Sequence, residues 1–130
     1  MTNYQKFTSE CMYSGNLDKA RAEGNPWLPA LEEVVSRLST STLERIMEGT
    51  MVWIIGGIPA VTLEIGSPKE YLILLPEGDW SFEARVGIIA HEFAHTMDGL
   101  ESCTYEWEAD ELATHWGFGK EVELAYEKCG

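Results

Sequence analysis

The stretch His91-Glu92-Phe93-Ala94-His95 decides how the rest of the chain is interpreted. Two histidines four residues apart project from the same face of a helix, because side chains at positions i and i+4 stack one above the other. Glu92 follows His91 by about 100° around the helix axis. The spacing therefore predicts a helix that presents two imidazoles and one carboxylate within a small volume.

Two imidazoles in this arrangement can hold one Zn²⁺, and a carboxylate beside them can take a proton from a water molecule on the metal. The pattern is written H-E-x-x-H, and each of its fixed residues has a mechanical role. We therefore predict that His91 and His95 bind zinc and that Glu92 is the catalytic base. Two histidines satisfied within an ordinary core are the simpler alternative.

The residues around the motif indicate that its helix is buried. The helix is expected to run to about Met97 and to end at Asp98-Gly99. Its face opposite the histidines is apolar and consists of Phe82, Val86, Ile89 and Phe93. Because buried polar groups need compensation, and metal coordination is one form of it, this setting favours the metal interpretation.

Length and composition limit the class of protein. The 130 residues suit one domain, residues 1–130, and a hydrophobic content of 45% suffices for a core. No apolar run approaches the ~18 residues that a membrane span needs, and the first residues lack the apolar region of a signal peptide. Three widely spaced cysteines indicate reduced thiols, so we expect a cytoplasmic protein with no membrane contact.

The formal net charge of −13 argues against a nucleic-acid partner, because binding phosphates requires clustered lysine and arginine. The H-E-x-x-H pattern is that of zinc peptidases, so the expected partner is a peptide or protein substrate.

The segments before the motif are expected to be helical first and extended later. Residues 1–25 are predicted to form a loosely ordered or partly helical lead-in, with a segment folded over the cleft as the alternative. A helix is expected over 28–38. Ser41 and Glu44 form a capping-box pattern for a second helix, which ends at Gly49.

Three short runs, 51–55, 60–65 and 71–75, are predicted to be strands of an antiparallel or mixed sheet. Residues 60–65 alternate between apolar and polar and are expected at the edge. The other two runs are uniformly apolar and are expected to be covered on both faces.

A third ligand is expected on the helix over about 104–116, which Gly117 should end. A catalytic zinc usually takes three protein ligands and keeps one position for water. Glu106 falls within the apolar side of this helix, so it is the predicted third ligand. Asp110, one turn later, is predicted to accept a hydrogen bond from a ligand histidine. His115 and Glu101 remain alternative ligands, and the final helix, about 119–128, is expected to pack loosely.

The combination of His91-Glu92-Phe93-Ala94-His95 with Glu106-Trp107-Glu108-Ala109-Asp110 resembles the gluzincin metallopeptidases, whose paired pattern is H-E-x-x-H followed by E-x-x-x-D. The short chain looks most like the minigluzincins and the ImmA/IrrE-type peptidases. The resemblance covers about residues 60–118. It implies an α+β, zincin-like core in which a small three-to-four-stranded sheet packs on the active-site helix and the following glutamate-bearing helix, with further helices N-terminal to the sheet.

The resemblance also implies a zinc-dependent endopeptidase, in which His91, His95 and Glu106 bind zinc, Glu92 is the base and Asp110 orients a ligand. The candidates for stabilising the oxyanion are Tyr105, Tyr126 and His115. Two alternatives stay open: a zinc-binding regulatory or partner-recognition module that cuts no peptide, and a self-inhibited zymogen.

Overall fold

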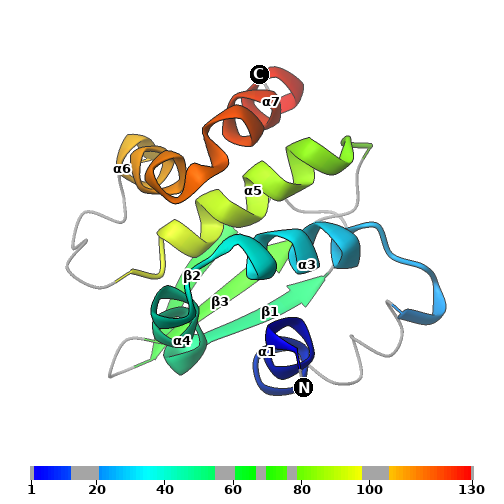
Figure 1. Ribbon diagram of the computed structural model, residues 1–130, viewed down its shortest axis with the longest axis vertical. Coiled ribbons are helices and arrows are strands. Elements are labelled where there is room, and N and C mark those ends of the chain that lie inside the picture. Colours follow the sequence, from blue (N-terminus) through cyan, green and yellow to red (C-terminus); the bar gives the residue numbers. More distant parts are fainter. Residues whose placement is uncertain are drawn as a thin grey trace.

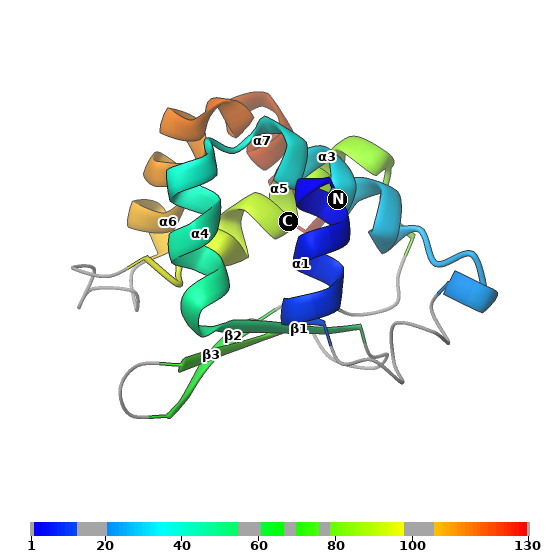
Figure 2. The same cartoon turned by 60° about the horizontal axis from the view of Figure 1, so that its bottom comes forward.

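The computed structural model describes residues 2–12, 21–54, 61–66, 70–75, 79–97 and 106–129. Most of these residues are helical, and the helices lie together on one side of a small sheet (Figure 1, Figure 2). The helices are α1 (Asn3–Cys11), α3 (Trp27–Arg37), α4 (Thr40–Gly49), α5 (Phe82–Ala94), α6 (Glu106–Ala113), the π-helix η1 (Thr114–Phe118) and α7 (Gly119–Cys129).

The sheet contains β1 (Thr50–Ile54), β2 (Val61–Gly66) and β3 (Glu70–Leu75), in the order β1-β3-β2. β1 runs parallel to β3, with Val52 opposite Ile73. β2 runs antiparallel to β3, with Leu63 opposite Leu72. The sheet is therefore mixed, with β3 between the other two strands. Among the described residues β2 is an edge strand, whereas Met12 forms an isolated parallel bridge with Val52 of β1.

In the part of the chain that the structure describes, the helices cover one face of the sheet (Figure 2). Val52, Ile73 and Leu75 are fully buried, whereas Met51 is 42% exposed. Since successive side chains of a strand point to opposite faces, Met51 lies on the face away from the helices. The prediction that the uniformly apolar strands are covered on both faces is therefore wrong for β1.

The predicted fold class needs correction, because the molecule is mainly helical and the sheet is a minor part of it. The helix that follows α5 and carries Glu106 is α6. It packs chiefly against α5, η1 and α7 rather than forming a layer on the sheet. The physical reason is the apolar character of α5 on most of its circumference, which lets other helices bury it.

Helix α5 lies at the centre of the helical layer and packs against α3, α6 and α7 (Figure 1). Its contact with α7 is unusually close, since a Cβ added at Gly87 would lie 2.2 Å from the backbone oxygen of Glu121. Val122 and Phe118 are buried beside it. The prediction that the last helix packs loosely is therefore wrong.

Helix α1 belongs to the core, so the expectation of a partly helical lead-in is confirmed over its residues and the expectation of loose order is wrong there. Thr2 and Gln5 form a capping box at its start, and Phe7 is fully buried with its ring 5.5 Å from that of Phe93. Burial raises the pKa of the Cys11 thiol to about 12, and the nearby carboxylate of Glu10 adds to the shift. Cys11 is thus a protonated, apolar side chain of the core.

The helix caps differ from expectation at one position. Ser39, not Ser41, caps α4, since its hydroxyl accepts a hydrogen bond of 3.2 Å from the amide of Thr42. Ser81 caps α5 by accepting from the amide of Ala84 at 3.1 Å. This cap fixes the start of the helix that carries the motif.

Candidate metal centre

The motif histidines lie at the C-terminal end of α5. His91 is within the last turn, and His95 is the C-cap residue, so the helix ends at Ala94, three residues earlier than expected. His95 keeps helical backbone angles (φ −63°, ψ −19°), and its amide donates to the carbonyl of His91. The i, i+4 relation between the two imidazoles therefore survives at the helix end.

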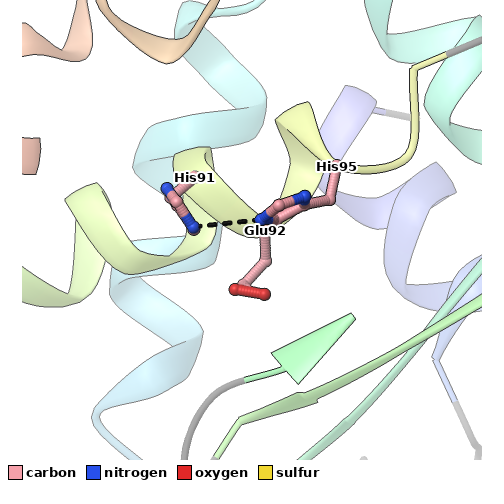
Figure 3. Close-up of side chains that lie close together, drawn as sticks. All are labelled: His91, Glu92 and His95. Carbon is pink, nitrogen blue, oxygen red and sulfur yellow. Dashed lines mark hydrogen bonds between the residues drawn. The ribbon is translucent and has the colours of Figure 1, made fainter. Parts of the chain in front are cut away.

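The two imidazoles converge through their Nε2 atoms, which lie 3.1 Å apart (Figure 3). The rings meet edge to face, with centroids 4.7 Å apart and an interplanar angle of 82°. Two nitrogens bound tetrahedrally to one zinc at ordinary bond lengths would be about 3.3 Å apart. The observed spacing fits a shared metal ion with little rearrangement.

Asp110 orients one of these rings. Its Oδ1 lies 2.6 Å from Nδ1 of His91, and both side chains are half-buried. A carboxylate accepts only, so the Nδ1–H of His91 donates to it. This tautomer leaves a lone pair on Nε2 of His91, which is the atom that faces His95.

Glu92 completes a group of three possible ligands. One ligand atom from each of His91, Glu92 and His95 lies within 4.8 Å of the others. Glu92 is only 5% exposed and His95 only 6%. The carboxylate of Glu92 points away from the line that joins the two Nε2 atoms (Figure 3). This orientation suits a base beside the metal better than a carboxylate that bridges the two imidazole rings.

The predicted third ligand, Glu106, is the first residue of α6, and its side chain lies outside the described part of the structure. Its backbone lies one helical turn before Asp110, the residue that contacts His91. Residues four apart share a helix face. The position of Glu106 on α6 is therefore compatible with the prediction, which stays a prediction.

The alternative candidates fall in different parts of the chain. His115 is exposed on η1 and does not belong to the described group of possible ligands. Glu101 and Tyr105 lie outside the described residues, as does the side chain of Tyr126. The structure therefore brings together His91, Glu92, His95 and Asp110.

Sequence reasoning missed two residues that hold these elements in place. Gly87 allows the close contact between α5 and α7, and an isolated glycine within an apolar helical pattern was the available signal. Arg37 joins α3 to the junction of η1 and α7. No sequence pattern pointed to Arg37, since its partners follow it by about 80 residues.

The chain matches no protein-family model, no curated protein sequence and no solved structure in comparisons with known proteins. Among the described residues, no helix combines the length and the apolar character needed to cross a membrane.

Proposed function

We propose that the protein is a zinc-dependent endopeptidase whose metal centre lies at the C-terminal end of α5. The observation that supports this most strongly is the pair of Nε2 atoms 3.1 Å apart, one of them on a ring held by Asp110. A helix end that is nearly buried and still carries two imidazoles and a carboxylate is hard to explain by packing alone.

His91 and His95 would hold the ion, and Glu106 would supply the third ligand from α6. Zinc, when bound, supplies Lewis acidity that polarises a carbonyl and acidifies a water molecule. Glu92 accepts the proton of the attacking water and passes it to the amine that leaves when the peptide bond breaks. Asp110 keeps His91 in the tautomer whose Nε2 carries the lone pair that would bind the metal.

The packing of α1 and α7 bears on the zymogen alternative. Phe7 contacts Phe93, which lies on the side of α5 opposite the histidines, and Gly87 contacts the backbone of α7. Both terminal helices therefore contribute to the core, and removing either should unfold the protein rather than release activity.

The test compares wild-type protein with Glu92→Gln, Glu106→Ala and His95→Ala. Wild type and Glu92→Gln should bind one equivalent of zinc, whereas His95→Ala should lose the metal and Glu106→Ala should hold it more weakly. Only wild type should cut denatured casein, with at least about a thousandfold loss in Glu92→Gln.

A chelator should stop cleavage, and added zinc should restore it. A wild-type protein that binds no zinc, or a Glu92→Gln variant that cuts as fast as wild type, would contradict the proposal. Stoichiometric zinc without hydrolysis by wild type would instead favour the partner-recognition alternative.

A further inference from the structure

Arg37, the last residue of α3, makes three contacts with the junction between η1 and α7. Its Nη2 donates a hydrogen bond of 2.6 Å to the carbonyl of Gly117, and its Nη1 lies 3.2 Å from Oε2 of Glu121. The guanidinium carbon also lies 4.2 Å from the centre of the Phe118 ring. One planar side chain therefore binds a backbone carbonyl, a carboxylate and an aromatic face at once.

The junction that Arg37 holds is a sharp change of direction. Gly117 has φ 102° and ψ 13°, a left-handed conformation that interrupts the helical path between α6 and α7. Such a break removes regular helical hydrogen bonds and leaves the relative direction of the two segments to tertiary contacts. Arg37 supplies such a contact at the residue where the direction changes.

The junction is connected to the metal centre by a continuous helical segment. η1 follows α6 without a gap, so Asp110 lies seven residues, or about two turns, before Gly117. Asp110 contacts His91 at 2.6 Å, and hydrogen bonds of this kind are sensitive to small displacements of either partner. A shift of the α6–η1 segment would therefore be felt at His91.

We propose that Arg37 is a positioning residue for the metal centre, acting through Gly117 and the α6–η1 segment on the contact between Asp110 and His91. The proposal rests on the proposed metal site but does not require peptidase activity. Arginine is needed because lysine has no planar fork and cannot bind the carbonyl and the carboxylate while stacking on Phe118.

The test measures zinc affinity and the ring nitrogens of His91 in Arg37→Ala and Arg37→Lys. Lysine keeps the positive charge at the end of α3. Arg37→Lys therefore separates the effect of the planar guanidinium from the effect of a positive charge at the helix C-terminus. Both variants should bind zinc about threefold to tenfold more weakly, a smaller effect than loss of a direct partner of a ligand. In the metal-free protein, the NMR signals of His91 should show a mixture of tautomers in both variants. Arg45→Ala, at an exposed position on α4, is the matched control and should change neither measurement.

A double-mutant cycle with Asp110→Asn decides whether the effect passes through Asp110. If it does, Arg37→Lys should have no further effect on zinc affinity or on the His91 signals once Asp110 is replaced. Equal effects in both backgrounds, or lowered thermal stability with unchanged zinc affinity and His91 signals, would overturn the proposal. If wild type binds no zinc, the proposed function fails, and the metal-free NMR comparison still tests the positioning role.

Discussion

Two stretches along the same side of α5 are built in different ways; Gly87 and His91 are four residues apart and so share this side. The stretch around Gly87 is close-packed: a methyl group added there would collide with the backbone of Glu121. The stretch at the end of the helix carries His91, Glu92 and His95, and its contacts with α6 include the hydrogen bond between His91 and Asp110. The first stretch contributes stability through burial, whereas the second keeps polar groups in a nearly buried place at a cost in stability. The proposed metal site would account for this cost.

The largest effect on stability is expected from Gly87→Ala, in the packed stretch of α5. The new Cβ would lie 2.2 Å from the carbonyl oxygen of Glu121, so α5 and α7 must separate. We expect a loss of about 3 kcal/mol in the free energy of unfolding, measured by urea denaturation. Gly119→Ala is the control, because there the nearest atom is the methyl group of Thr114 at 3.1 Å, which can move. Equal stability of Gly87→Ala and wild type would show that the two helices are not in close contact.

Asp110→Ala should affect the polar stretch of α5 and leave the packed stretch intact. The lost hydrogen bond removes one constraint on the ring of His91, so zinc affinity should fall by about tenfold to a hundredfold. Isothermal titration with zinc measures this, and the urea midpoint of the metal-free protein should change little. Glu111→Ala, an exposed position on the same helix, is the control. The contrast between the two stretches of α5 would break down if the variant lost stability but bound zinc normally.

A smaller effect on the free energy of unfolding is expected from pH, through the buried thiol of Cys11. Its pKa is about 12 in the folded protein against 9.0 for a free thiol, so the unfolded chain loses this proton first as pH rises. The stability associated with the neutral thiol is complete below pH 9 and is lost progressively between pH 9 and 12, by about 1.4 kcal/mol at pH 10. Cys11→Ala should lack this component, so the stability difference between the variant and wild type should vary with pH in that window. A difference that stays constant from pH 8 to pH 10 would show that the thiol is not shielded.

The smallest effect is expected at Met51, on the open face of the sheet. Met51→Thr replaces a side chain that is 42% exposed by one that suits a strand, so the change in stability should be within about 0.5 kcal/mol. Val52→Thr, the adjacent buried position, is the comparison and should destabilise the protein clearly. A large loss at Met51 in thermal denaturation would show that this face is covered in solution.

Local patterns in the sequence placed most of the helices and strands within a few residues. The i, i+4 histidines and Gly117, at which the helical path after α6 breaks, are short-range features, and their structural consequences follow from helix geometry. The errors concern packing between distant segments. Residues 3–11 looked polar, yet a single aromatic residue, Phe7, anchors them in the core against Phe93.

In the candidate site, too, geometry within one helix could be predicted from the sequence, whereas geometry between helices could not. The convergence of His91 and His95 could be predicted because both belong to one helix. A hydrogen bond from a ligand histidine to Asp110 was predicted from the helical wheel. That this histidine is His91, at a distance of 2.6 Å, depends on how α6 is placed against α5. That placement involves the break in the helical path at Gly117. It also involves the hydrogen bond from Arg37 to the carbonyl of Gly117, which joins segments 80 residues apart.

By itself, the sequence determined a buried helix that presents two imidazoles and a carboxylate, because helical periodicity acts over four residues and needs no partner. Only the tertiary structure decided that helices rather than strands surround α5, how closely α7 approaches Gly87, and which ring Asp110 holds. These outcomes depend on the fit of side chains that are far apart in the chain, and such fit has no short-range sequence pattern.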